Sequence, residues 1–203
     1  MITMIDYGGS NLRSAQKAFE AVGAAVTITT DPDQIRAAQT LVLPGVGAFG
    51  SGMDGLRQHR LIPAIHDAVT AGTPLLGICL GLQFLFDISE EMGTHDGLGL
   101  IPGRIIRFPD NDLKIPHVGW NQIHHNETHP LLANVPTDTS YAYFVHSYHC
   151  APTNPNHIIA TTDYGLNFPA IVGRDNVYGI QFHPEKSQQV GLQIIRNFIH
   201  MTS

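Results

Sequence analysis

Apolar and polar residues follow two different periods along the first half of the chain. Short apolar runs predict buried strands at residues 2–5, 25–29, 40–43 and 74–78. Between these runs we expect three helices: one after Asn11, where apolar positions recur at helical spacing up to Val22, a short one that opens with Asp31–Pro32, and one from about Pro63 to Ala71 that Gly72 stops. Asn11 and Asp31 stand where helix-capping side chains are favoured. Strands that alternate with short helices are typical of βαβ units, so we expect an α/β fold with a doubly wound, mostly parallel sheet and helices on both faces.

The second half of the chain changes character. Short β-type runs without helices between them occur at residues 104–108, 141–145, 157–160 and 170–172. We expect these runs to be antiparallel strands added to the parallel core, which makes the sheet mixed. A further strand begins at Tyr178 and ends in His183-Pro184-Glu185, and an amphipathic helix from about Ser187 to His200 closes the chain. Because no repeat, low-complexity tract or linker interrupts the chain, we interpret residues 1–203 as one domain.

Composition narrows the class of function. The formal net charge of −6 gives no electrostatic basis for binding nucleic acid or an anionic membrane. No apolar run approaches the ~20 residues that span a bilayer, and neither terminus carries a secretory segment, so we expect a cytoplasmic protein without membrane contact. Cys79 and Cys150 allow at most one disulfide, which favours a reducing compartment.

Cys79 lies in Gly77-Ile78-Cys79-Leu80-Gly81, directly after an apolar run. The flanking glycines let a strand turn sharply into a helix and lift one side chain clear of the sheet. A thiol at that point faces the positive end of the helix dipole, which favours the nucleophilic thiolate. The pattern therefore predicts that Cys79 is a nucleophile.

His183 and Glu185 end a strand much later in the chain. Residues two apart in an extended segment point to the same side, so Glu185 can fix the tautomer of His183. In an open parallel sheet, function gathers at the carboxyl ends of the strands, where we expect Cys79, His183 and the loop 44–50 to meet. A thiol, an imidazole and a carboxylate together predict a hydrolase of the acyl-transfer type.

Backbone N–H groups near Cys79 complete this interpretation. Leu80 is the first residue of the new helix, so its N–H points at the oxyanion that develops during acyl transfer. Gly45-Val46-Gly47 can bring a second N–H alongside, from Val46 or Gly47, because glycine lets the peptide turn inward.

Other motifs have simpler explanations. Cys150 lacks a comparable setting, and we interpret it as a small buried side chain. The histidines of 124–129 lack metal-ligand spacing and precede Pro130, so a polar surface loop is favoured over a metal site. No G-x-G-x-x-G follows a strand with an acidic residue downstream, so nucleotide binding is disfavoured. We expect no metal and no cofactor.

Three motifs together resemble the class I glutamine amidotransferases: Leu-Pro-Gly-Val-Gly at 43–47, Gly-Ile-Cys-Leu-Gly-Leu-Gln at 77–83 and Gln-Phe-His-Pro-Glu at 181–185. The resemblance covers the whole chain and implies hydrolysis of the side-chain amide of L-glutamine. Gln83 lies four residues along the helix from Cys79, on the same face, where it can hydrogen-bond the substrate. By similarity, groups at Gly45, Gly47, Ser147 and Tyr148 hold the two ends of glutamine.

Three further segments look like one branch of this family, the glutaminase subunits of imidazole glycerol phosphate synthase in histidine biosynthesis. They are residues 6–14, 117–121 and 143–148. The resemblance implies a heterodimer in which ammonia passes to a (β/α)8-barrel cyclase subunit, which makes imidazole glycerol phosphate and an aminoimidazole carboxamide ribotide. It also implies that Tyr7, Asn11 and Trp120 face that partner, while Ser10 stands where this branch commonly has glycine.

Three alternatives stay open at this point. A glutaminase subunit of anthranilate, purine or pyridoxal phosphate synthesis shares the Cys-His-Glu set but does not need the segment 117–121. A free-standing cysteine hydrolase of γ-glutamyl peptides uses similar elements and works without a partner. A catalytically inactive binding module is disfavoured by the intact Cys79, His183 and Glu185. An α/β-hydrolase is disfavoured because its acid normally precedes its histidine.

Overall fold

The computed structural model describes residues 1–9, 11–110, 113–126 and 128–202. Ser10, singled out as a departure from the branch, lies outside the described residues, as does Glu127 of the histidine-rich loop. The strands are β1 (Ile2–Ile5), β2 (Val26–Thr29), β3 (Leu41–Gly45), β4 (Leu75–Cys79), β5 (Phe86–Ser89), β6 (His95–Asp96), β7 (Ile101–Arg107), β8 (His117–Gln122), β9 (Tyr141–His146), β10 (Tyr148–Pro152), β11 (Ile158–Asp163), β12 (Asn167–Arg174) and β13 (Val177–Ile180). The helices are α1 (Leu12–Ala21), α2 (Pro32–Arg36), α3 (Phe49–Gln58), α4 (Leu61–Thr70), α5 (Leu80–Phe84) and α6 (Gln188–Met201), with 3-10 turns η1 (Pro130–Leu132), η2 (Pro155–His157) and η3 (Pro184–Lys186).

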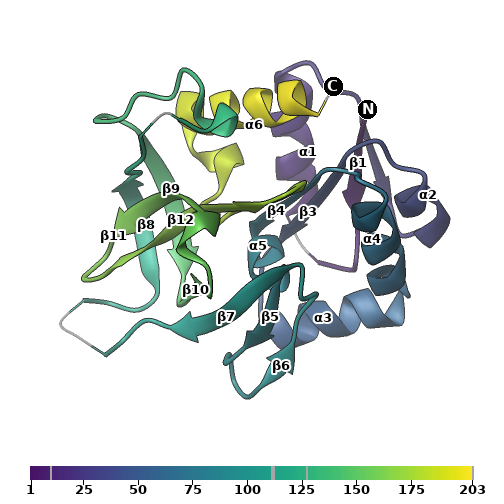
Figure 1. Ribbon diagram of the computed structural model, residues 1–203, viewed down its shortest axis with the longest axis horizontal. Helices are drawn as coiled ribbons and strands as arrows, with labels where there is room; N and C mark the ends of the chain where they lie inside the picture. Colours follow the sequence, from purple (N-terminus) through teal and green to yellow (C-terminus); the bar gives the residue numbers. More distant parts are fainter. Residues whose placement is uncertain (10, 111–112, 127, 203) are drawn as a thin grey trace.

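The main sheet runs through the centre of the molecule (Figure 1). Within the described residues it has seven strands in the order β11-β12-β13-β4-β3-β1-β2. The strands from β13 to β2 are mutually parallel, whereas β12 and β11 join the β13 edge in antiparallel orientation. The expected mixed, mostly parallel sheet is therefore confirmed.

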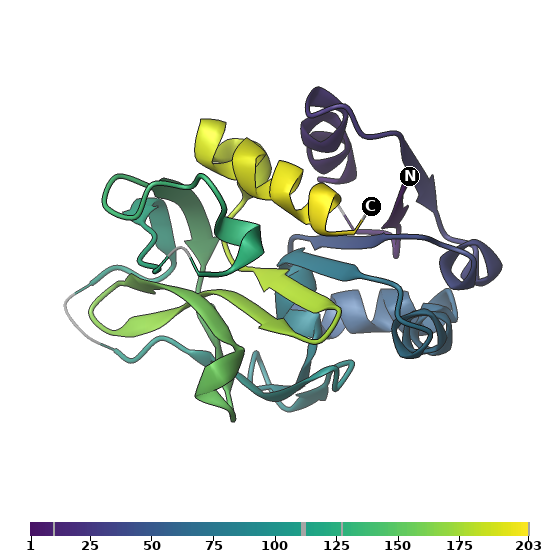
Figure 2. The same ribbon diagram turned by 45° about the horizontal axis from the view of Figure 1, so that its top comes forward.

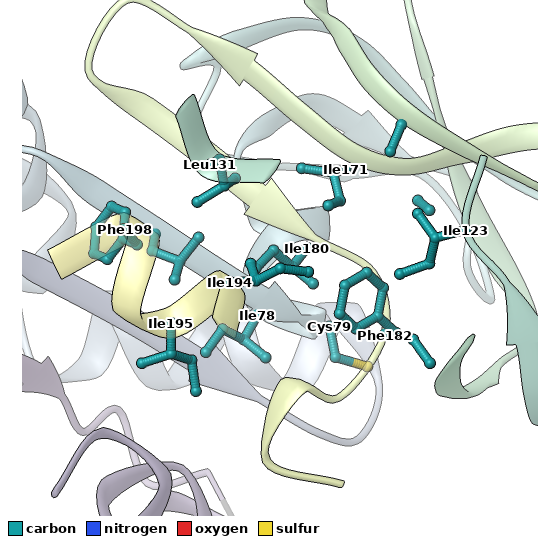
Figure 3. Close-up of a cluster of buried hydrophobic side chains, with 14 of the residues drawn as sticks. Ile78, Cys79, Ile123, Leu131, Ile171, Ile180, Phe182, Ile194, Ile195 and Phe198 are labelled. Atoms are coloured by element: carbon teal, nitrogen blue, oxygen red, sulfur yellow. The ribbon is translucent and has the colours of Figure 1, made fainter. Parts of the chain in front are cut away.

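Helices cover both faces of this sheet, as Figures 1 and 2 show. Alternation along β3 explains the two layers: Val42 belongs to the core under α1 and α6, while Leu41 and Leu43 belong to the core under α2, α3, α4 and α5. Figure 3 shows part of the first core, where side chains of β4 and β13 meet those of α6. Both faces of the central strands are buried, which accounts for their continuous apolar sequence.

Two smaller sheets depart from the simple expectation. The predicted strand at 104–108 is the end of β7, which lies in a separate sheet of order β10-β7-β5-β6, and the run at 141–145 is β9, which pairs only with β8 within the described residues. The apolar runs identified strands here but gave no information on their partners, because pairing is set by tertiary packing. Helix α3 was not predicted, since its three glycines at 50, 52 and 55 weaken the helical pattern.

One capping prediction is confirmed and the other is wrong. The Asp31 carboxylate accepts a hydrogen bond from the N–H of Asp33 at 2.9 Å and caps α2. Asn11 stands at the start of α1, but its backbone is left-handed (φ 75°) and its side chain makes no capping hydrogen bond. That side chain is engaged elsewhere, at the candidate site.

Candidate active site

Cys79 ends β4 and directly precedes α5, at a strained turn. Its φ of 55° and ψ of −107° lie outside the regions that ordinary residues prefer. The glycines beside it are required by close packing: a Cβ on Gly81 collides with the carbonyl of Leu43, and one on Gly77 lies 2.5 Å from the carbonyl oxygen of Gly81. The predicted elbow is thus built where α5 packs against the backbone of the sheet.

A pocket of about 270 Å³ opens at the carboxyl ends of the parallel strands. Its wall includes Cys79, Leu80, Val46, Gly47, Gln83, Ser147, Tyr148 and His183, all predicted from the sequence, together with Glu91, Pro116, Val145 and His146. The thiol of Cys79 is nearly buried, with 6% of the residue exposed. The sequence motifs therefore converge on one cavity.

His183 and Glu185 form a buried pair beside the thiol. The Nδ1 of His183 lies 2.8 Å from Oε1 of Glu185, and their side chains are only 1% and 3% exposed. Burial opposes a charge on His183, but the neighbouring Cys79 and Glu185 outweigh it and raise the pKa of His183 to about 9. Burial likewise opposes the charge on Glu185, yet its hydrogen bonds to His183 and Asn11 hold the pKa of Glu185 below its ordinary value. The pair is charged at neutral pH.

The route to this geometry differs from the expected one. β13 ends at Ile180, and Glu185 lies in the 3-10 turn η3 rather than in an extended segment. The turn, not strand alternation, brings the carboxylate back to the imidazole. The N–H of His183 donates to the carbonyl of Tyr143 at 2.9 Å, which ties the turn to β9.

Asn11 supplies a third member of this group. Its Nδ2 donates to Oε1 of Glu185 at 2.7 Å, across most of the length of the chain. The left-handed backbone at Asn11 aims the side chain at Glu185 instead of at the first turn of α1. Sequence reasoning placed Asn11 at the partner interface, and its contact with the carboxylate carried no recognisable local signal.

The segment 45–47 lies on the opposite side of Cys79. Gly45 pairs with Cys79 at the ends of β3 and β4, and a Cβ on Gly45 collides with the hydroxyl of Tyr7. Gly47 has a φ of 112° and open space around its Cα, so only glycine suits its conformation. Conformational freedom in this segment is therefore concentrated at Gly47, while Gly45 is held by its neighbours.

Gln83 and Glu91 line the pocket from two further directions. Nε2 of Gln83 donates to the carbonyl of Tyr148 at 3.1 Å, so this amide is already partly engaged within the protein. Glu91 was missed by sequence reasoning; its Oε2 accepts from the N–H of Phe49 at 2.6 Å, at the start of α3. No motif marks Glu91, because the fold brings it to the pocket from a loop after β5.

The three residues expected at a partner interface differ in exposure. Tyr7 is only 5% exposed, its ring packs edge-on against Phe84 at 5.5 Å, and burial, Cys79 and Asp6 raise its pKa. Its side chain is thus placed behind the 45–47 segment and not on the surface. Trp120, in contrast, is 48% exposed on β8. A partner-facing role for Tyr7, Asn11 and Trp120 stays a prediction.

The remaining sequence candidates lie away from this pocket. Cys150 is a free, fully buried thiol, and burial raises its pKa. His124, His125 and His129 border a separate surface cleft, and among the described residues no three His, Cys, Asp or Glu side chains converge as metal ligands. In the part of the chain that the structure describes, every helix is too short or too polar to cross a bilayer.

Comparison with known proteins identifies the fold and the family of this chain. Residues 3–201 match the family described as glutamine amidotransferase class-I. A solved structure described as a glutamine amidotransferase aligns with a TM-score of 0.78 at 15% identity over 100% of this chain and 99% of that one. The PurLQS structure from Thermotoga maritima aligns with a TM-score of 0.77 at 18% identity over 100% and 98% of the two chains. These likenesses establish the fold, and the match over residues 3–201 defines the class.

Sequence similarity to curated relatives is much higher. Imidazole glycerol phosphate synthase subunit HisH from Syntrophotalea carbinolica is 52% identical over 98% of this chain and 98% of its own length. The HisH subunits of Salinibacter ruber and Bacillus subtilis are 50% and 47% identical, over 98% and 100% of this chain and 93% and 97% of their own lengths. Within the class I glutamine amidotransferases, the chain therefore belongs to the HisH subunits of imidazole glycerol phosphate synthase. The resemblance drawn from the sequence motifs is confirmed.

Proposed function

We propose that this chain hydrolyses L-glutamine to glutamate and ammonia, with Cys79, His183 and Glu185 as its catalytic residues. The observation that carries the proposal is that one pocket holds His183, charged through its buried partner Glu185, beside a thiol on a strained elbow. An imidazolium next to the sulfur favours the thiolate, and a buried carboxylate keeps the ring in one orientation. Membership of the HisH family supports the same activity.

The reaction proceeds in two steps. The sulfur of Cys79 attacks the side-chain amide carbon of glutamine, and the oxyanion accepts hydrogen bonds from the N–H of Leu80 and of Val46 or Gly47. His183 protonates the departing nitrogen, which leaves as ammonia, and a γ-glutamyl thioester remains on the sulfur. His183 then removes a proton from water, which attacks the thioester carbonyl and releases glutamate and the thiolate.

The pocket offers separate groups for the two ends of the substrate. Glu91 presents a carboxylate suited to the α-ammonium group, although one of its oxygens is shared with the N–H of Phe49. Backbone groups of Gly47, Ser147 and Tyr148 suit the remaining α-amino and α-carboxylate contacts, and Gln83 supports this wall through Tyr148. Gly45 acts indirectly, by anchoring the 45–47 segment.

The ammonia requires an acceptor chemistry, which we propose is supplied by the cyclase subunit. Large apolar side chains that are exposed gather on the two-stranded sheet of β8 and β9: Val118, Trp120, Tyr141 and Val145. Alternate residues of a strand share one face, so these side chains form a single apolar surface, and Val145 also lines the pocket. A contiguous exposed apolar patch beside an active site fits a docking surface for the partner.

Two features support the remaining details of the proposal. The cores on the two faces share the strands of one sheet, which suits a single domain over residues 1–203. Cys79 and Cys150 are free thiols, which suits the reducing cytoplasm.

The test measures glutamate release by the purified chain alone, with the cyclase, and with the cyclase and its ribotide ligand. We expect strong stimulation in the last mixture and no turnover by Cys79→Ala in any of them. Equal turnover without the cyclase supports a free-standing hydrolase instead. Stimulation by a different synthase, and not by this cyclase, assigns the chain to another branch of the glutamine amidotransferases.

A further inference from the structure

A hydrogen-bonded series of side chains leads into one wall of the active pocket, where His146 is a lining residue with no role assigned so far. Nδ2 of Asn121 lies 3.3 Å from Nε2 of His117, and Nδ1 of His117 lies 3.2 Å from Nε2 of His146. Nδ1 of His146 lies 2.8 Å from the carbonyl oxygen of Tyr148. The contacts pass from β8, through the end of β9, to the first residue of β10.

The direction of every hydrogen bond in this series is determined. A carbonyl only accepts, so the proton of the His146 ring is on Nδ1 and its Nε2 is an acceptor. His117 must then donate from Nδ1 and accept at Nε2 from the Asn121 amide. Burial lowers the pKa of His146 to about 3 and of His117 to about 4, so both rings are neutral. Asn121 is itself oriented, because its Oδ1 accepts from the N–H of Gln122 at 2.8 Å and its Nδ2 donates to the carbonyl of Asp163 at 2.7 Å.

The inner end of the series holds the pocket wall. The carbonyl of Tyr148 accepts from His146 and from Nε2 of Gln83, and the carbonyl of Ser147 accepts from the N–H of Phe108 at 3.1 Å. Both residues line the pocket, where the ends of an amino acid must be recognised. With both carbonyls held, the orientation of the peptide groups in this wall is held too.

We propose that His146 is a positioning residue for glutamine, and that His117 and Asn121 hold it in the one tautomer that fixes the Tyr148 carbonyl. The inference rests on the proposed glutaminase function and deepens it. The hydrogen bonds of His146 among the described residues join His117 and Tyr148, and not Cys79 or His183. Loss of these hydrogen bonds therefore weakens glutamine binding and leaves the reactivity of the Cys79 thiol unchanged.

The test is a comparison of KM with kcat for glutamine in the complex with the cyclase and its ribotide ligand. His146→Phe keeps an aromatic ring that packs against Phe108 and Phe168, whose ring centroids lie 5.2 and 5.3 Å from that of His146. We expect KM to rise about tenfold and kcat to change less than about threefold. His146→Asn retains an N–H donor near Nδ1 and should return KM to within about threefold of the parent.

Two further variants distinguish the effect of the hydrogen bonds from the effect of ring packing. His117→Phe removes the donor to Nε2 of His146 while keeping the stack on Tyr164, whose ring centroid is 4.1 Å away, and we expect KM to rise about threefold to fivefold. His149→Phe is the matched control, because His149 packs on the same Phe108 and Phe168 but donates from Nδ1 to the carbonyl of Cys150. We expect its KM to stay within about twofold of the parent.

Alkylation of Cys79 by iodoacetamide in the isolated chain gives an independent measure of the thiol, and we expect His146→Phe to react at the parent rate. An unchanged KM in folded His146→Phe overturns the proposal, and so does an equal rise in His149→Phe. If His146→Phe does not fold, the test rests on His117→Phe. A parent-like KM in that variant overturns the proposed role of the hydrogen-bonded histidines. Absence of glutamate release by the parent complex rejects the proposed function itself, which is a separate outcome.

Discussion

The two sides of the active pocket each hold a buried histidine, and one of the two is charged while the other is neutral. His183 is 1% exposed, and its pKa is raised to about 9. His146 is 7% exposed, and its pKa is lowered to about 3. Burial opposes the charge in both, so the difference comes from the partners: a carboxylate and a thiol for His183, a carbonyl and a neutral ring for His146.

The two cysteines also differ in their surroundings, because Cys79 lines the pocket and Cys150 lies in the core away from it. Cys79 stands beside His183, on the charged side that we assign to the chemistry. Cys150 lies next to His149 in β10, fully buried and away from the pocket, with its pKa raised by that burial. The pocket thus has a charged reacting side around His183 and, on its other side, a wall held by neutral histidines. The role of each histidine is therefore set by the partners of its side chain, and not by the residue type alone.

The largest effect is expected from Glu185→Gln, which makes the partner of His183 neutral and so makes the charged side resemble the other. Without the carboxylate, burial is less opposed and the pKa of His183 falls. We expect kcat for glutamine to drop about 100-fold or more, since general acid–base catalysis is impaired. Steady-state glutamate release in the cyclase complex measures this. Retention of more than half of the parent kcat contradicts the assignment of Glu185.

The pH dependence of the parent sharpens the same comparison. The raised pKa of His183 predicts that kcat/KM falls as the pH rises through about 9, because the acid that protonates the departing amide nitrogen is lost. The sign for stability is the same: a pKa above the ordinary 6.5 contributes stability in full below about 6.5, and the contribution is lost as the pH rises through about 9. Rate profiles and thermal unfolding between these pH values test both. An alkaline limit that stays in place in Glu185→Gln argues against His183 as its source.

An intermediate effect is expected at Asn11, which hydrogen-bonds Glu185 from outside the pair. Asn11→Gly removes the side-chain amide, and glycine readily adopts the left-handed backbone of this position, so the substitution adds no backbone strain. We expect kcat to fall about threefold to tenfold, with the acid limb of the pH profile moved upward, because this hydrogen bond helps to lower the pKa of Glu185. Asn134→Gly is the matched control, an exposed asparagine with a φ of 60°. Equal losses in the two variants reveal a backbone effect and not a contact with Glu185.

The sequence was sufficient for the charged side of the pocket. The elbow around Cys79 is a local signal, since glycines at 77 and 81 are dictated by packing within one strand–turn–helix unit. The parallel orientation of the strands was equally accessible, because strands that alternate with helices are typical of βαβ units. The turn η3 shows the limit: His183 and Glu185 meet as expected, but through a 3-10 turn that spacing alone does not distinguish from a strand.

The neutral side was not predictable in the same way. His117, His146 and Asn121 meet only because β8 and β9 pair in one register, with His117 opposite His146. Glu91 reaches the pocket, and Asn11 reaches Glu185 on the charged side, from loops whose course depends on the whole fold. Periodicity reports which face of an element is buried, but it carries no information on which distant polar group a side chain will meet.

The smallest effect is expected from Cys150→Ala, which tests whether the thiol away from the pocket takes any part in the chemistry. The sulfur of Cys150 lies 3.9 Å from the carbonyl of Pro169 within the core, away from the pocket. Removing it leaves a small cavity, so we expect the free energy of unfolding to fall by about 1 kcal/mol while kcat and KM stay within about twofold. Chemical denaturation and glutamate release measure the two effects. A turnover loss as large as that of Cys79→Ala would mean that the thiol away from the pocket reacts, and the division between the two cysteines would fail.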